Sequence, residues 1–254
     1  VNEYPKDKSL IEEFLRKKHA FKVEIESPQR GKKLELINST LKNAEENLNR
    51  KIYEKSSNQK NLLKLQDAFH FRKRIKKLEV YDNSHHQGKS PVGAMIAFNE
   101  DGFLKSLYRK YNINSEYKNK NLSKNSETLN NNDYLMMKEV IERRFTGKAS
   151  SNYPDLLIID GGKGHLNTVL SVLKKLKIDD IEVLAVSKGI KRDAGRESFY
   201  TKYNDKIIFE KDDTILFFLQ KLRDEVHRYA ITGHRLKSKK RLFQNPLDEI
   251  DGIG

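Results

Sequence analysis

The sequence predicts an α/β fold in which helices flank a mixed β-sheet, preceded by a mainly helical region. Residues 156–159 form a continuous apolar run of strand length, which is typical of a strand buried on both faces, and residues 181–186 are predicted to be another buried strand. Residues 165–176, which lie between them, have the apolar spacing of a helix. Because a helical crossover joins parallel strands, these two strands are predicted to run parallel within one sheet.

The earlier strands are predicted to be antiparallel. Residues 78–82 alternate like a strand, and residues 92–98 and 103–113 are typical of a hairpin. The polar stretch over residues 114–132 is predicted to be a mobile loop. The remaining predicted elements are a helix over 133–145, an outer hairpin of 198–203 with 206–210, and a long helix over 214–240. This order of elements is that of the RNase H-like architecture, and it covers residues 76–245.

Residues 1–75 are polar, and most of their apolar side chains fall at helical spacing. They predict a helix that runs to about Tyr53 and restarts after a break at residues 56–59. A short strand is expected at residues 21–25, followed by a turn at residues 27–31. We therefore expect a mainly helical flanking region ahead of the sheet.

The composition favours a polyanionic partner. The 254 residues include 50 Lys plus Arg against 36 Asp plus Glu, which gives a formal net charge of +14. A solvated basic surface with no such partner would give the same balance. The absence of cysteine excludes disulfides, thiolate metal sites and cysteine nucleophiles, and it fits a reducing compartment. No apolar run approaches a membrane span and no signal peptide is evident, so a cytoplasmic protein is expected.

Two aspartates are candidates for metal binding. Asp82 lies at the end of the first predicted strand, and Asp160 directly follows the buried strand over residues 156–159. At one edge of the sheet they could hold Mg²⁺ or Mn²⁺, which prefer oxygen ligands and can activate water for phosphodiester cleavage. Each also has a structural alternative, because Asp82 could initiate a turn and Asp160 could cap the next helix.

His227 is the candidate proton carrier or nitrogen ligand on the last predicted helix. Arg223 and Asp224 lie one turn earlier on the same face, and the alternative is a plain surface histidine. Residues 161–164 contain three glycines but lack the Walker pattern, which argues against nucleotide binding. The glycines instead allow the backbone to approach a substrate phosphate or a packed helix closely.

Four basic residues are candidates for DNA binding: Lys163, Arg223, Arg235 and Lys237. Arg235 and Lys237 belong to a basic run near the end of the last helix, which could contact phosphates or simply be a solvated helix end favoured by the macrodipole. The segment over residues 108–111 alternates aromatic and basic side chains. It could contact DNA or form the face of an edge strand.

Several segments, in order along the whole chain, resemble the excision-repair nuclease family UvrC. The most specific match is residues 154–164, which include Asp160 and the double glycine, followed by residues 222–235 with His227. The other matching segments are residues 27–31, 81–88, 108–113 and 132–144. Residues 247–254 resemble the start of the family's helix-hairpin-helix tail, so we expect the sequence, which begins without Met and stops at Gly254, to be part of a longer protein.

The resemblance implies an RNase H-like endonuclease that makes the 5′ incision beside a lesion in nucleotide excision repair. It implies catalytic and metal-binding roles for Asp82, Asp160 and His227, which match the family's catalytic set, and a further catalytic role for Asp133. The implied cofactor is Mg²⁺ or Mn²⁺, and the implied partners are damaged double-stranded DNA and UvrB loaded by UvrA. The domain that makes the 3′ cut and the segment that docks on UvrB are expected to lie outside this sequence.

Two alternatives remain open from the sequence. One is another RNase H-like repair nuclease, which substrate competition would distinguish. The other is a DNA-binding module whose carboxylates are structural. In that second case, Mg²⁺ would change neither activity nor thermal stability.

Overall fold

The computed structural model describes residues 1–19, 21–84, 92–113, 126–147, 152–187, 197–203 and 206–242, with the side chains of residues 84, 126–132 and 233–242 outside that description. The chain forms two compact units, residues 1–54 and residues 55–254. The sequence instead predicted the boundary between the helical region and the sheet domain near residue 76. Each unit is described by itself.

The first unit contains α1 (Lys8–His19) and the first part of α2 (Lys32–Phe69). None of its described residues is buried. The strand predicted at residues 21–25 is wrong, because the backbone there bonds to other groups instead of to a strand. The Ile25 N–H donates to the Glu12 carboxylate at 2.7 Å, and the Val1 ammonium donates to the Glu26 carbonyl at 2.8 Å.

The break predicted at residues 56–59 is also wrong, because α2 continues through it. The polar side chains in this stretch have partners on the turn between two strands of the second unit. The Lys55 ammonium lies 2.9 Å from Glu100 and 3.0 Å from Asp101, and the Asn58 amide donates to the Glu100 carbonyl at 3.2 Å. These contacts hold the polar segment in helical form where its sequence alone suggested an interruption.

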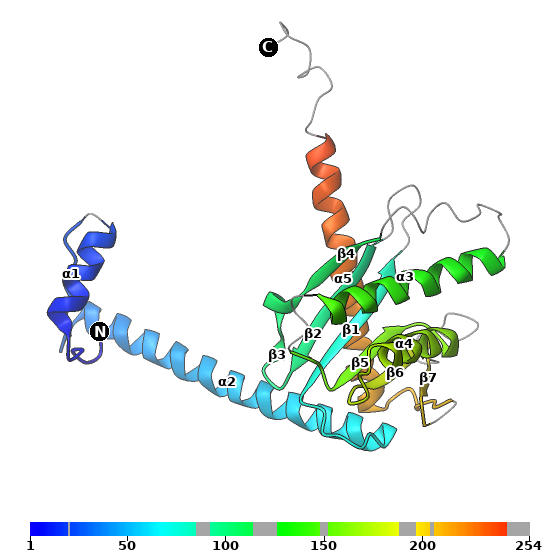
Figure 1. Ribbon diagram of the computed structural model, residues 1–254. Coiled ribbons are helices and arrows are strands. Elements are labelled where there is room, and N and C mark those ends of the chain that lie inside the picture. The colour runs from blue at the N-terminus through cyan, green and yellow to red at the C-terminus, as the bar shows by residue number, and fades with distance from the viewer. Residues whose placement is uncertain are drawn as a thin grey trace, which may run out of the picture. The chain divides into compact units, whose positions relative to one another are not determined.

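A mixed sheet forms the centre of the second unit (Figure 1). Its strands are β1 (Lys77–Ser84), β2 (Val92–Asn99), β3 (Gly102–Phe103), β4 (Arg109–Asn112), β5 (Leu156–Asp160), β6 (Glu182–Ser187) and β7 (Ser198–Thr201). The order is β3-β2-β1-β5-β6-β7, with β4 also pairing to β2. The pairs β1–β5 and β5–β6 are parallel and the others are antiparallel, which confirms the predicted mixed sheet.

Three predicted elements differ from those observed. The third strand is split, because η1 (Lys105–Leu107), a 3₁₀ helix, separates β3 from β4. In the outer hairpin, β7 meets the second arm only through the isolated bridge between Phe199 and Ile207. The predicted loop over residues 114–132 ends early, since α3 (Ser126–Thr146) already begins at Ser126, and the part before Ser126 lies outside the described residues.

One aspartate fixes how the parallel strands begin. The Asp155 carboxylate accepts hydrogen bonds from the N–H groups of Lys76 and Lys77, each at 2.9 Å. The Asp155 backbone donates to the Lys77 carbonyl at 2.8 Å and accepts from the Glu182 N–H at 2.9 Å. The starts of β1, β5 and β6 are therefore tied to one residue, which sets their mutual register.

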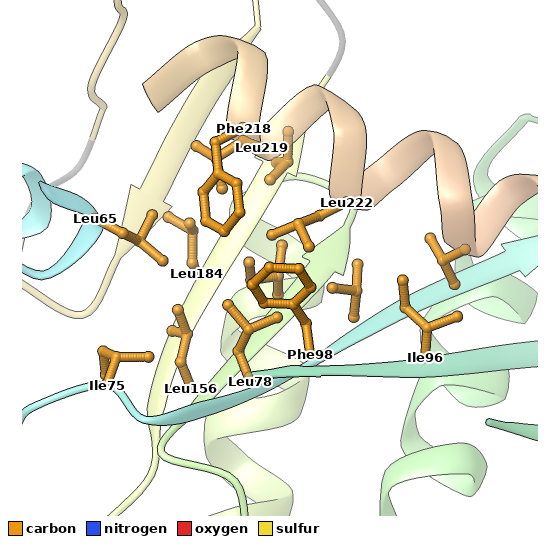
Figure 2. Close-up of a cluster of buried hydrophobic side chains, with 14 of the residues drawn as sticks. Leu65, Ile75, Leu78, Ile96, Phe98, Leu156, Leu184, Phe218, Leu219 and Leu222 are labelled. Atoms are coloured by element: carbon orange, nitrogen blue, oxygen red, sulfur yellow. The ribbon is translucent and has the colours of Figure 1, made fainter. Parts of the chain in front are cut away.

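Side chains of β1 and β5 alternate between two buried layers. Leu78, Val80, Leu156 and Ile158 belong to the layer beneath α5 (Thr214–Leu242) and the end of α2. Figure 2 shows Leu78 and Leu156 of this layer facing Phe218, Leu219 and Leu222 of α5. The opposite layer holds Tyr81, Leu157 and Ile159 against α3 and α4 (Lys163–Lys175). No helix in the described ranges is long and apolar enough to cross a membrane.

The end of α2 is part of the hydrophobic core of the second unit. Phe69 is fully buried, and its ring centroid lies 5.6 Å from that of Phe71, 5.8 Å from Phe199 and 5.5 Å from Phe209. Such aromatic pairs add to the stabilisation from burial itself. The last turns of α2 therefore belong to the second unit energetically as well as geometrically.

A buried ion pair joins α3 to the centre of the sheet. Arg144 and Glu79 are 7% and 2% exposed, and the guanidinium donates to the carboxylate from Nη2 at 2.7 Å and from Nε at 3.1 Å. The Tyr81 hydroxyl donates to the same carboxylate at 2.6 Å, and burial, with the Glu79 charge, holds the pKa of Tyr81 well above its usual range. Removing one partner would leave a buried charge without compensation.

We expect Phe69→Ala to lower the free energy of unfolding of the second unit by about 3–5 kcal/mol, because it removes a fully buried ring. The matched control is Tyr53→Ala in the same helix, since the Tyr53 side chain is 76% exposed. Urea unfolding followed by circular dichroism measures both. Equal, small losses in the two variants would show that the end of α2 does not belong to this core.

We expect Arg144→Met to destabilise the fold by about 3–5 kcal/mol, because Glu79 is then buried without its cation. The double variant Glu79→Gln with Arg144→Met should lose less, since the neutral amide still accepts from Tyr81. Chemical denaturation of the two single variants and the double variant gives the coupling energy. Additive losses would contradict a coupled pair.

Candidate active site

The parallel pairing of β1 with β5 brings two of the candidate residues together. The register ends with Tyr81 opposite Ile159, so the next positions along the two strands are Asp82 and Asp160. Neighbouring strands lie about 4.8 Å apart, and these positions share the face of the sheet that α5 covers. The two carboxylates therefore lie at the same end and on the same face of the sheet, as their sequence positions suggested.

His227 reaches this end of the sheet from α5. Leu222, Val226 and Ala230, spaced four residues apart, pack against the sheet, and His227 directly follows Val226. Its Nδ1 lies 3.1 Å from the Oδ2 of Asp82, within hydrogen-bond distance. The Asp82 side chain is 8% exposed and the His227 side chain 57% exposed. A buried carboxylate thus orients an imidazole that stays accessible to solvent.

Asp133 lies on α3, and its charge acts on the same histidine as the charge of Asp160. Burial lowers the pKa of His165, while the negative charges of Asp133 and Asp160 act to raise it. Both carboxylates are therefore close enough to His165 to influence its protonation. Asp133 approaches this end of the sheet from the α3 side, whereas His227 approaches it from the α5 side.

The glycines after Asp160 make room for aromatic side chains. A Cβ on Gly161 would lie 2.4 Å from Cγ of His165, and a Cβ on Gly164 would lie 2.5 Å from the hydroxyl oxygen of Tyr134. Real side chains do not approach so closely, so both positions need glycine. The sequence suggested that these glycines allow close approach to a substrate phosphate or to a packed helix, and the structure shows close packing against side chains of α3 and α4. Sequence reasoning missed His165 and Tyr134, although the question of what the glycines accommodate could have pointed to them.

Arg223 is held within the fold. Its guanidinium lies 2.9 Å from the Glu197 carboxylate and 3.4 Å from Asp224, and Gln220 also donates to Glu197 at 3.1 Å. Glu197 is only 4% exposed. Burial opposes its ionisation, but hydrogen bonds from its own backbone, Arg223 and Gln220 lower its pKa. The orientation of Arg223 is therefore set by a buried acid.

The other basic candidates differ in what the structure places. Lys163 is exposed in the first turn of α4, three residues after Asp160. The side chains of Arg235 and Lys237 lie outside the described residues. In the aromatic and basic segment of β4, Tyr108 donates to Glu225 at 3.0 Å and Lys110 donates to the Ala230 carbonyl at 3.1 Å. These bonds tie the strand to α5, which favours the structural interpretation of that segment.

The donor atoms fit a hard divalent cation. In the described part of the chain, no three His, Cys, Asp or Glu side chains already form a closed metal site. Mg²⁺ is often held by only one or two carboxylates, with water and substrate phosphates completing its shell. Asp82, two residues before the end of β1, and Asp160, the last residue of β5, supply carboxylates of that kind, with the His227 imidazole beside Asp82.

The chain is similar to known proteins along its whole length. UvrABC system protein C of Sphingopyxis alaskensis is 40% identical over 261 residues, and that of Caulobacter vibrioides is 41% identical over 261 residues. Each match covers 100% of this chain and 39% of the relative, so the chain spans about two fifths of their length. The catalytic domain of human endonuclease V matches 57% of this chain and 59% of its own at 15% identity, with a TM-score of 0.34, which is too low to support an argument.

Two family models match separate parts of the chain. The UvrC Ribonuclease H-like domain matches residues 1–51, and the UvrC RNAse H endonuclease domain matches residues 66–231. The second match contains Asp82, Asp133, Asp160 and His227 and confirms the RNase H-like fold expected from the order of strands. The chain therefore belongs to the UvrC RNAse H endonuclease domain family.

Proposed function

We propose that this chain is the nuclease part of an excision-repair protein and hydrolyses a phosphodiester bond on the 5′ side of a DNA lesion. The observation that carries the proposal is the contact of His227 with Asp82 at the strand end beside Asp160. All three residues lie within the region that matches the endonuclease family model. A buried acid, an accessible imidazole and a neighbouring carboxylate are the groups that metal-assisted hydrolysis requires.

Asp82 and Asp160 would hold Mg²⁺ or Mn²⁺, which, when bound, lowers the pKa of water and neutralises charge on the phosphate. In the tautomer that carries its hydrogen on Nδ1, His227 donates to Asp82, and the Nε2 lone pair is then able to take or return a proton. The same carboxylate stabilises the imidazolium that forms. Asp133 is proposed as a further acid of the site, close to His165 and Asp160.

The proposed substrate is damaged double-stranded DNA, presented by UvrB after loading by UvrA. The net charge of +14 and the exposed Lys163 beside the strand end support a phosphate-rich partner. The relatives are named as components of the UvrABC system, which supports the protein partners. A cytoplasmic site of action fits a DNA substrate and the absence of cysteine. The hairpin segment over residues 246–254 lies outside the described residues and stays a prediction.

We expect Asp82→Asn and Asp160→Asn to abolish incision, because each removes a charged oxygen ligand. His227→Ala should lower the rate about 10²–10⁴-fold, the usual contribution of a general acid or base. The matched control is Asp212→Asn, an exposed carboxylate just before α5, which should leave the rate unchanged. The assay uses the chain in its full-length context with UvrA, UvrB, ATP, Mg²⁺ and a lesion-bearing duplex already nicked on the 3′ side.

Equal incision by wild-type protein and Asp160→Asn would remove that residue from the mechanism. Retained DNA affinity with lost cleavage separates a catalytic role from a binding role. An unchanged melting temperature on addition of Mg²⁺, together with no cleavage, would instead support a module that only binds DNA.

Lys163→Ala and Arg223→Ala test the proposed phosphate contacts. We expect Lys163→Ala to reduce the slope of log K against log salt for DNA binding by about 1, with unchanged stability. Arg223→Ala should lower the free energy of unfolding by about 1–3 kcal/mol, because the buried Glu197 loses its charged partner. The slope of log K against log salt for the Arg223→Ala variant then tests whether Arg223 also contacts phosphate. An unchanged slope would limit Arg223 to stabilising the fold.

A further inference from the structure

Two aromatic rings meet between α3 and α4 next to the proposed site. The ring centroids of Tyr134 and His165 lie 4.6 Å apart, with 59° between the planes. Tyr134 directly follows Asp133 on α3, and His165 lies in the first turn of α4, five residues after Asp160. The ring pair therefore joins the two segments that carry these carboxylates.

The backbone of two glycines lies directly against this ring pair. The missing Cβ of Gly161 leaves the space in which the His165 ring lies, and the missing Cβ of Gly164 leaves the space for the Tyr134 ring. Gly161 is the residue after Asp160, and its N–H donates to the Val186 carbonyl on β6 at 2.8 Å. Movement of the His165 ring would therefore be transmitted to Gly161, the residue next to Asp160, and movement of the Tyr134 ring to Gly164.

Buried residues other than this pair also pack α3 against α4. Met137, Val140 and Ile141 of α3 are buried in the same layer as Leu166 and Val169 of α4. Tyr134 and His165, in contrast, are only partly buried. We therefore expect the two helices to remain packed without the rings, which leaves the rings available for a local role.

We propose that Tyr134 and His165 are positioning residues, whose contact sets the relative placement of Asp133 and Asp160 and so the affinity of the site for its divalent cation. The inference rests on the proposed function, in which these carboxylates serve a metal-dependent nuclease. Groups that support metal ligands without touching the metal commonly change its affinity 10–100-fold, as a rough range. A ring of similar shape should replace either member, since the role is steric.

The test compares variants that remove a ring with variants that keep one. Tyr134→Ala and His165→Ala remove the contact, whereas Tyr134→Phe and His165→Phe retain an aromatic ring. The matched control is Tyr153→Ala, because Tyr153 packs edge-on against Phe145 near the other end of α3, at 5.4 Å between centroids. Mn²⁺ binding is measured by electron paramagnetic resonance with a short duplex present, alongside melting temperature and the Mg²⁺ dependence of incision.

We expect Mn²⁺ to bind about 10-fold or more weakly to the two ring-removing variants. The phenylalanine variants and Tyr153→Ala should bind it as wild type does. Folded ring-removing variants with wild-type Mn²⁺ affinity would overturn the proposal and leave the pair a packing contact. If His165→Phe binds as poorly as His165→Ala, the imidazole itself is a ligand, and a purely steric role is again overturned.

Failure of the proposed function gives a different result from failure of this inference. If wild-type protein binds no Mn²⁺, or if Asp160→Asn binds it equally well, the metal-dependent site itself is wrong. If wild-type protein binds Mn²⁺ through Asp160 while the ring-removing variants match it, only the positioning role fails.

Discussion

The register between β1 and β5 is the constraint on which the rest of the structure depends. Asp155 fixes it at the start of the strands, because its carboxylate accepts from the N–H groups of Lys76 and Lys77 and its own N–H donates to the Lys77 carbonyl. A slip of one residue would turn Asp82 to the α3 side of the sheet, away from His227, and would also exchange the two buried layers. A polar residue about five positions from the proposed site thus determines which side chains that site contains.

The two faces of the sheet position the residues of the proposed site in different ways. On the α5 side, an almost wholly apolar layer ends at His227, so the imidazole is placed by the packing of its neighbours. On the α3 side, the buried pair of Glu79 and Arg144 fixes the far end of α3. Tyr134 lies toward the other end of the same helix, against His165. The proposed site would therefore combine one residue carried by an apolar layer with carboxylates on two strands and on a helix that a buried ion pair anchors.

Much of this arrangement was predictable, because the relevant signals are local. The run at residues 156–159 is apolar throughout, which is typical of a strand buried on both faces, and residues 181–186 are apolar except for Glu182. The misses are places where tertiary contacts override the local pattern, as at Asn58, whose amide is engaged by the β2–β3 turn. Asp82, Asp160 and His227 occupy recognisable motifs. Tyr134 lies in a segment that resembles the family and His165 directly follows one, but nothing in the sequence pairs them, since their contact exists only once α3 lies on α4.

The helix α2 runs from a unit without buried side chains into a unit with a hydrophobic core. Its last turns carry Leu65 and Phe69 inside a core, whereas none of the described residues up to Glu54 is buried. Isolated helices gain little stability in water without an apolar face to bury. One continuous helix is thus divided between two cooperative units. The amide protons in its early turns exchange with solvent when the helix frays, whereas those in its last turns exchange only when the sheet unfolds.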